Sequence, residues 1–112
     1  MVTKKDIDIL RERIVETADP ERIILFGSYG RGAQTEDSDL DILVIVKKSK
    51  YPRYKRARTI RKKIWGLVSI PKDILVYTEK EIQESKDIKY SFISNVLAEG
   101  VTIYERRSPS VS

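Results

Sequence analysis

The chain has 112 residues, of which 40% are hydrophobic, and this is enough for one domain with a sizeable core. It contains no cysteine and no histidine, which excludes disulfides, thiolate metal sites and imidazole catalysis, so any metal must be held by oxygen, as Mg²⁺ or Mn²⁺ prefers. No apolar run approaches the roughly 18–20 residues that span a bilayer, and the N-terminus lacks a signal peptide's apolar core, so we expect a cytoplasmic protein with no membrane partner.

The net charge of +5 is concentrated in one segment of the chain. Ten of the 22 Lys and Arg residues lie between Lys47 and Lys63, a stretch that contains no acidic residue. The rest of the chain then has 12 basic and 17 acidic side chains, a balance of −5. The basic character therefore belongs to residues 47–63, which we call the basic segment, and does not describe the whole surface.

The first predicted element is a helix over residues 3–17. Its apolar residues recur at intervals of three and four from Ile7 to Ile14, with charges between them. Thr3 and Asp6 have the spacing of an N-terminal capping box, in which each satisfies a backbone amide of the other.

Two strands are predicted on either side of a glycine-rich turn. The short apolar run at residues 22–26 predicts a buried strand, and the turn at 27–33 is expected to include one short helical turn. A polar loop over residues 34–38 leads to a long β-branched run at 39–46, which predicts a second strand.

Within the basic segment, Pro52 suits the start of a helix. Apolar residues at helical spacing follow it, so the positive charges are expected on the other faces of the helix. This apolar stripe consists of Tyr54, Ala57, Ile60, Ile64 and Leu67. Tyr54 is therefore expected in the core. The charged faces are expected to meet solvent, an RNA backbone or an acidic protein partner.

The remaining chain is predicted to form a strand at 72–78, a polar helical turn at 78–86, a helix at 88–100 that ends at a glycine, and a short strand at 101–105. The irregular alternation of helices and strands predicts an α/β (α+β) fold class, a small mixed β-sheet with helices packed against it. We expect a single domain over residues 1–105 and a disordered tail over 106–112.

Two aspartates at the start of the second predicted strand form a candidate metal site. Asp39 and Asp41 are separated by one residue, so their side chains stand on one face while Leu40 and Ile42 point into a core. Two neighbouring carboxylates repel each other unless a cation lies between them or one is protonated. On a rigid strand, such a pair can bind Mg²⁺ together with phosphate oxygens.

The glycine-rich turn that precedes them is a candidate phosphate site. Gly27 lets the backbone leave the first strand at angles that other residues disfavour, and Ser28 offers a hydroxyl and an amide. Gly30 and Gly32 remove side-chain bulk near an anion, and Arg31 adds a cation. Either feature alone is commonly only structural, but together they are the equipment for phosphoryl or nucleotidyl transfer.

The motif "GSYGRG" followed by "SDLDILV" resembles the signature of the DNA polymerase β-type nucleotidyltransferase superfamily, in its minimal nucleotidyltransferase (MNT) branch. The match runs from about Arg22 to Val46, and with Asp73 the resemblance covers most of the chain from Ile7 to Tyr104. Gly30 is a mild departure, since the branch often has alanine there. The resemblance implies the polymerase β-type nucleotidyltransferase fold and ATP as a substrate.

The resemblance also implies a third carboxylate from a neighbouring strand, for which Asp73 is the candidate because it too opens a predicted strand. Asp39, Asp41 and Asp73 would then be the catalytic and metal-binding residues, with Gly27, Ser28, Gly30 and Arg31 binding the nucleotide. Glu36 and Asp37 lie in the loop and are expected to be solvated or to lie outside the direct ligands.

The resemblance implies a partner as well. MNT proteins often work beside a HEPN-domain toxin, which they adenylylate as its antitoxin, commonly on a tyrosine. Occlusive binding of the toxin without catalysis, and nucleotide addition to RNA held by the basic segment, remain the alternatives. The sequence leaves open whether the protein forms a homo-oligomer.

Overall fold

The computed structural model describes residues 2–106, so the tail predicted over 106–112 lies outside the described residues apart from Arg106. Within residues 2–106 the strands are β1 (Arg22–Phe26), β2 (Leu40–Val46), β3 (Lys72–Thr78) and β4 (Val101–Glu105). The helices of the same region are α1 (Lys4–Ala18), α2 (Gly27–Arg31), α3 (Arg53–Ile64), α4 (Glu79–Ser85) and α5 (Phe92–Glu99). None of the helices in this part of the chain is long and apolar enough to cross a membrane.

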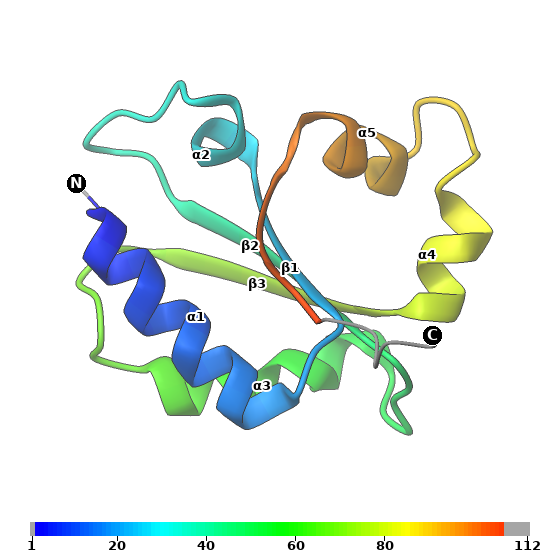
Figure 1. The fold of residues 1–112 in the computed structure, drawn as a ribbon, viewed down its shortest axis with the longest axis horizontal. Helices are drawn as coiled ribbons and strands as arrows, with labels where there is room; N and C mark the ends of the chain where they lie inside the picture. Colours follow the sequence, from blue (N-terminus) through cyan, green and yellow to red (C-terminus); the bar gives the residue numbers. More distant parts are fainter. Residues whose placement is uncertain (1, 107–112) are drawn as a thin grey trace, which may run out of the picture.

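The strands form one mixed sheet in the order β3-β2-β1-β4, which confirms the predicted fold class (Figure 1). β1 is antiparallel to both β2 and β4, whereas β2 and β3 are parallel. The parallel pair needs a crossover, and α3 supplies it after β2. β2 is a central strand, and every residue from Ile42 to Val46 is buried.

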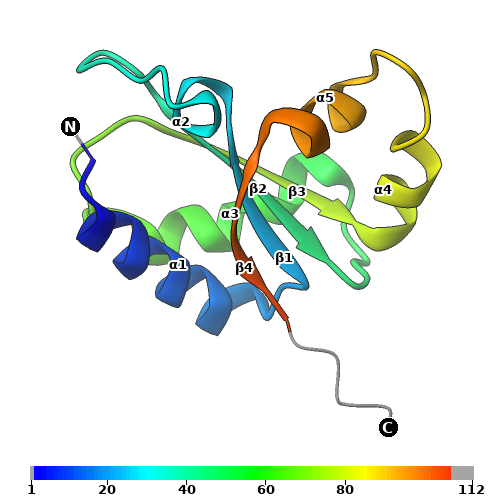
Figure 2. The same cartoon turned by 45° about the horizontal axis from the view of Figure 1, so that its top comes forward.

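Helices cover both faces of the sheet (Figure 2). α1 and α3 pack on one face, where a larger cluster includes Leu10, Ile42 and Ile60. α4 and α5 pack on the other face, where a smaller cluster includes Leu43 and Ile93. The two faces of β2 therefore both contribute to the core, which is why its sequence is almost continuously apolar.

The capping box predicted at the start of α1 is confirmed. Thr3 Oγ1 accepts from the Asp6 amide, and Asp6 Oδ2 accepts from the Thr3 amide. Two later boundaries differ from the prediction. α3 ends at Ile64, before Gly66 with its φ of 80°, and α5 begins only after Tyr90, whose φ of 65° interrupts the helix.

The predicted burial of Tyr54 is wrong, because its side chain is 76% exposed. The buried face of α3 is formed by Ala57, Ile60 and Ile64. At about 100° per residue, Tyr54 lies roughly a quarter of a turn from the centre of that face. Leu67, the last residue of the predicted stripe, follows the helix and only packs partly against the core.

Two arginines of the basic segment bind one carboxylate and join α3 to α4. Arg56 Nη1 lies 2.5 Å from Glu81 Oε1, and Arg53 Nη2 lies 3.5 Å from Glu81 Oε2. The same Glu81 closes the capping box of α4 by accepting from the Thr78 amide at 2.8 Å. Burial alone would raise the pKa of Glu81, but the hydrogen bonds from Arg56 and Thr78 and the two arginine charges lower it to about 2.

Replacement of this carboxylate should destabilise the fold in a pH-dependent way. We expect Glu81→Gln to lower the free energy of unfolding by about 1–3 kcal/mol at pH 7, because the two guanidinium groups lose the negative charge and one of the two acceptor oxygens. A carboxyl with a lowered folded pKa stabilises the protein above its unfolded pKa, which is 4.5, and loses that effect as the pH falls toward 2. Urea unfolding at several pH values measures the difference.

The exposed Glu79, in the same first turn of α4, provides the matched control. Glu79→Gln should change the unfolding free energy by no more than about 0.5 kcal/mol. A Glu81→Gln deficit of constant size from pH 7 to pH 2.5 would contradict the assigned role of the charge.

Candidate active site

The ends of all four strands meet along one edge of the sheet, the edge that runs across the strands, because of the strand directions. β1 is antiparallel to β2, so the end of β1 lies beside the start of β2. The start of β3 lies there too because it is parallel to β2, and the start of β4 lies there because it is antiparallel to β1. α2 follows β1 and α5 precedes β4, so both short connections also reach this edge (Figure 1).

This edge brings together the three aspartates that the sequence singled out. Asp41 pairs in register with Asp73 on one side and with Phe26 on the other. Asp39 directly precedes β2 and is exposed, as is Asp73, whereas Asp41 is half-buried. By strand alternation, Asp41 faces the side of the sheet that α4 and α5 cover, and its neighbour Leu40 is buried on the opposite side.

The pKa of Asp41 is shifted by its burial and by the carboxylates around it. Burial, followed by the negative charges of Asp73 and Asp39, raises the pKa of Asp41, and the positive charge of Arg31 opposes the shift. The three carboxylates and Arg31 are therefore close enough to influence one another. In the part of the chain that the structure describes, however, no group of three acidic side chains already forms a metal-ligand cluster. The three carboxylates lie near one another, but their oxygens are not arranged around one point as the ligands of a bound metal are.

The chemistry of these donors nevertheless fits a hard divalent cation. Carboxylate oxygens are the ligands that Mg²⁺ and Mn²⁺ prefer, and a cation beside Asp41 would relieve the repulsion from Asp39 and Asp73. Asp39, Asp41 and Asp73 are the residues that would hold it.

Gly27 fits against the Asp41 carboxylate. Its φ of 64° lies in the left-handed region, and a Cβ at this position would overlap Asp41 Oδ2. The first residue after β1 must therefore be glycine for two reasons, its backbone conformation and the space that the carboxylate occupies. This contact places the glycine turn directly beside the carboxylates.

The turn itself is the short helix α2, held by close backbone packing. A Cβ on Gly30 would lie 2.8 Å from the carbonyl oxygen of Leu25 and 3.4 Å from the Cα of Gly100. Gly30 thus has a packing reason to be glycine, beside the nucleotide contact predicted for it. Ser28, the second residue of α2, is half-buried, and Nη1 of Arg31 at the end of α2 lies 3.9 Å from Glu99 Oε2.

The sequence interpretation did not foresee two of these residues. Gly100 was expected only as the end of a helix, but it also lies so close to β1 that a Cβ would be 2.5 Å from Ile24 Cγ2 and 3.0 Å from the carbonyl oxygen of Leu25. Glu99 carries the charge opposite Arg31 and had no motif to reveal it. The predicted residues 27, 28, 30, 31, 41 and 73 lie on elements that reach this edge, and residue 39 directly precedes one of them. Their roles in binding and catalysis remain predictions.

Neighbouring carboxylates beside a glycine turn, at one end of a mixed sheet, are an arrangement suited to phosphate-transfer chemistry. The sequence profile of the nucleotidyltransferase domain family matches residues 7–98. The chain belongs to this nucleotidyltransferase family.

Individual relatives agree with this membership. A protein of Methanocaldococcus jannaschii, provisionally named a protein adenylyltransferase, is 41% identical over 101 residues, covering 89% of this chain and 90% of its own. The crystal structure of a Sulfolobus solfataricus protein, provisionally a nucleotidyltransferase, has 22% identity, a TM-score of 0.58, and 92% and 86% coverage. A toxin-antitoxin structure with AMP-PNP has 21% identity, a TM-score of 0.56, and 95% and 76% coverage. These two structures share the fold.

The contact between Gly27 and Asp41 can be tested by a double-mutant cycle. Gly32 has a similar φ of 70° but open space around it, so Gly32→Ala should cost only backbone strain, about 1–2 kcal/mol. Gly27→Ala should cost a further 1–3 kcal/mol or so, because its Cβ overlaps the carboxylate. In an Asp41→Ala background this excess should disappear. Denaturant unfolding of the four variants measures it, and an unchanged excess would contradict the contact.

The repulsion among the carboxylates predicts a stabilising substitution. A carboxyl whose folded pKa is raised destabilises the fold once it is ionised, so Asp41→Asn should raise the Tm at pH 7 without divalent metal. The gain should vanish as the pH falls below 3.8, the ordinary pKa, since the carboxyl is then protonated in both the folded and unfolded states. Thermal melts in a chelator measure it. The exposed loop residue Asp37, changed to Asn, is the control, and a lower Tm for Asp41→Asn would contradict the repulsion.

Proposed function

We propose that this protein transfers AMP from ATP to a hydroxyl group of a partner protein, and that the partner is a HEPN-domain toxin which it adenylylates as an antitoxin. The main support for the transfer reaction is the strand pairing that places Asp41 opposite Asp73, while the glycine turn follows the strand on the other side of Asp41. The names of the relatives support a protein acceptor, and the toxin-antitoxin likeness supports a toxin. We further propose that residues 1–105 act as one domain in the cytoplasm.

In this proposal each part of the sheet edge has one role. Ser28 and the backbone amides of α2 hold the β- and γ-phosphates, with Gly27 and Gly30 keeping the backbone close, and Arg31 adds positive charge. Asp39, Asp41 and Asp73 are the residues that would hold Mg²⁺ or Mn²⁺. A divalent ion bound there would offset the negative charge of the triphosphate and of the departing pyrophosphate.

A side chain of the protein takes up the proton that the acceptor hydroxyl loses. The acceptor hydroxyl oxygen forms a bond to the α-phosphorus, and the bond from that phosphorus to the bridging oxygen breaks, so pyrophosphate leaves with the electron pair. The hydroxyl proton passes to the carboxylate of Asp73. The chain has no histidine, so a carboxylate is the natural general base.

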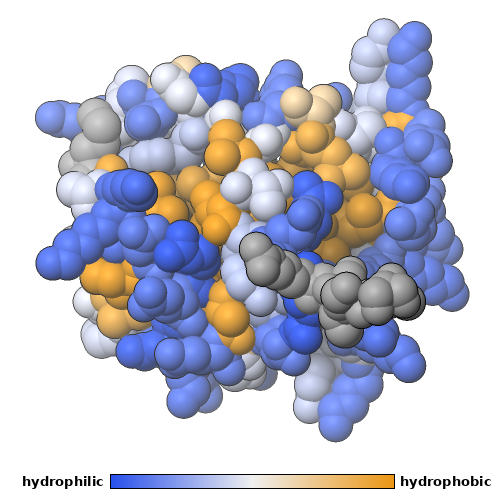
Figure 3. Space-filling view, viewed as in Figure 1, coloured by the Kyte–Doolittle hydropathy of each residue, from blue (hydrophilic) through white to orange (hydrophobic). Residues whose placement is uncertain are grey.

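The surface beside the site favours a protein as the acceptor. Apolar side chains gather around α5 on the face shown in Figure 3. Phe92 at the start of α5 and Val101 at the start of β4 are 43% and 47% exposed. Exposed apolar surface next to a transfer site is typical of a place where another protein docks.

Nucleotide addition to an RNA end is the second candidate function. It is favoured by the basic segment, whose helix α3 has exposed positive charges along much of its length. This candidate shares the reaction chemistry and differs only in the acceptor.

Transfer can be measured with α-labelled ATP, Mg²⁺ and the protein encoded by the adjacent gene. We expect label on that protein, and we expect Asp39→Asn and Asp41→Asn to lower the rate by about 100-fold or more. Asp37→Asn should retain activity, because Asp37 is an exposed loop residue. ATP with Mg²⁺ should also raise the Tm of the native protein and should raise that of Asp41→Asn much less.

Two other results would overturn the proposal. Label on RNA with none on protein would favour the second candidate function. If the double variant with both Asp39 and Asp41 changed to Asn still protects cells fully from the toxin, neutralisation occurs by occlusive binding alone.

A further inference from the structure

One side of α3, about a quarter of a turn from its buried face, has a row of exposed aromatic and basic side chains. Tyr54, Arg58, Arg61 and Trp65 follow one another at intervals of four, three and four residues, so they lie in one line along the helix. All four are exposed, and the aromatic ends of the row are 76% exposed at Tyr54 and 86% exposed at Trp65. We call these four residues the α3 row.

The positive charges of the α3 row differ from those at the start of the helix. Arg53 and Arg56 both pair with Glu81, and they serve the fold. Within residues 2–106, Arg58 and Arg61 have no ion pair with an acidic side chain, and neither does the neighbouring Lys62. The basic segment thus contains one structural pair and a separate exposed group.

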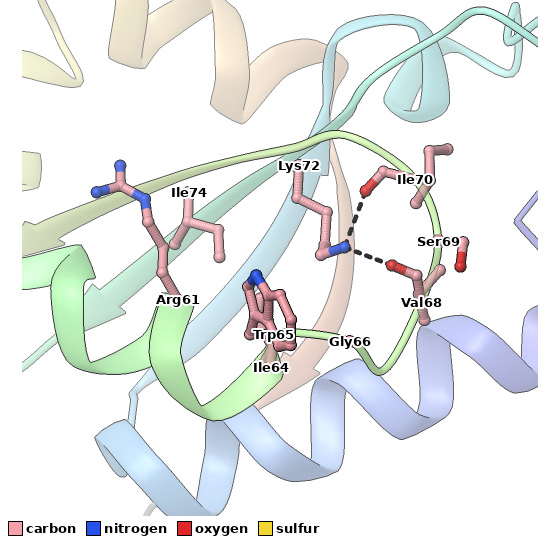
Figure 4. Close-up of a pocket in the computed structure, with 9 residues that line it drawn as sticks. All are labelled: Arg61, Ile64, Trp65, Gly66, Val68, Ser69, Ile70, Lys72 and Ile74. Atoms are coloured by element: carbon pink, nitrogen blue, oxygen red, sulfur yellow. Dashed lines mark hydrogen bonds between the residues drawn. The ribbon is translucent and has the colours of Figure 1, made fainter.

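The α3 row ends at a cavity of about 370 Å³ between the end of α3, the following loop and the start of β3. Trp65 and Arg61 line it together with Lys72, and Ile64 and Ile74 form part of its apolar wall. Figure 4 shows the Trp65 indole beside Ile64 and below Lys72 in that view, with the Arg61 side chain directed away from it.

Lys72 closes one side of this cavity. Its Nζ donates to the carbonyl oxygens of Val68 at 2.7 Å and Ile70 at 2.8 Å, which fixes the loop around the opening. Two of the three ammonium donors are then occupied. The cavity therefore combines an exposed indole, positive charge and apolar walls in a fixed shape.

We propose that the α3 row binds single-stranded nucleic acid, with one base stacked on Trp65 at the mouth of this cavity. Bases stack on aromatic rings without regard to sequence, and phosphates bind the guanidinium groups between them. The row spans about 16 Å at 1.5 Å per residue, which accommodates a few nucleotides. The alternation of rings and guanidinium groups along one line matches the alternation of bases and phosphates in a nucleic-acid strand, and this match favours nucleic acid over an acidic protein segment.

This site is separate from the carboxylates. Lys72 and Ile74 precede and follow Asp73 on β3, so they face the opposite side of the sheet, where Ile74 joins the core cluster under α1 and α3. Binding on the α3 row therefore does not depend on the transfer reaction proposed above, and the Asp41→Asn variant should bind as well as the native protein.

Trp65 is the single tryptophan of the chain, so its fluorescence reports directly on stacking. We expect a 12-nucleotide single-stranded RNA to quench this fluorescence and to bind with an affinity that falls steeply with salt. Trp65→Ala should weaken binding about fivefold or more in fluorescence anisotropy of labelled RNA, and Trp65→Phe should restore most of it. Arg61→Ala should also weaken binding and should lower the salt slope by about 0.7.

Tyr90 is the matched control, since it is 80% exposed on the loop before α5 and Lys89 lies over its ring. Tyr90→Ala should leave RNA affinity unchanged, and an RNA duplex of the same length should compete more weakly than the single strand. The proposal is overturned if RNA leaves the Trp65 fluorescence unchanged, or if Trp65→Ala binds RNA like the native protein. It is also overturned if polyglutamate displaces the RNA at equal charge concentration, because that result assigns the surface to an acidic protein.

Discussion

The pairing register of β1, β2 and β3 is the constraint on which the rest of the site depends. It places Asp41 beside Phe26, the last residue before the glycine turn, and beside Asp73, the first acidic residue of the parallel neighbour. A slip of one residue would turn Asp41 into the core under α1 and α3, and would move Leu40 and Ile42 to the face that α4 and α5 cover. Because β2 is buried on both faces, the core itself enforces the register that the carboxylates require.

The opposite end of the sheet is fixed by a different interaction. Glu81 accepts from Arg56 and from the Thr78 amide, so a single carboxylate caps α4 and ties it to the first turn of α3. This carboxylate differs from Asp41 in its environment. The positive charges around Glu81 lower its pKa, whereas burial and negative neighbours raise the pKa of Asp41. One carboxylate stabilises the fold as an anion, and the other destabilises it.

The sequence predicted the architecture well because its signals were local. The apolar run at residues 22–26 became β1 with the same bounds, and the Thr3 capping box opened α1 as expected. The candidate site residues were chosen from local motifs and, for Asp73, from the family resemblance, and their roles stay predictions. The contact of Gly27 with Asp41 depends on strands that meet only in the fold. Spacing alone could not place Tyr54, because a helix buries only the part of a stripe that its sheet covers.

Other features had no sequence signal. The pairing of Arg53 and Arg56 with Glu81 joins positions 25 or more residues apart, so the basic segment looked uniform before the fold was known. The cavity beside Trp65 depends on the path of the loop between α3 and β3 and on the two carbonyls that Lys72 binds. The fold therefore separates the basic segment into two groups. One consists of the arginines that pair with Glu81 and stabilise the fold, and the other consists of exposed cations that can contact a ligand.

The placement of the carboxylates explains how a small fold tolerates their repulsion. Asp39 and Asp73 are exposed at the ends of strands, where water screens their charges, and only Asp41 is half-buried. The unfavourable free energy of this repulsion therefore falls mainly on the Asp41 side chain, at the start of the strand with the most buried residues. A cation bound beside Asp41 would remove this repulsion, and the free energy released would add to the affinity for the cation. The repulsion that destabilises the metal-free protein would therefore favour the metal-bound protein.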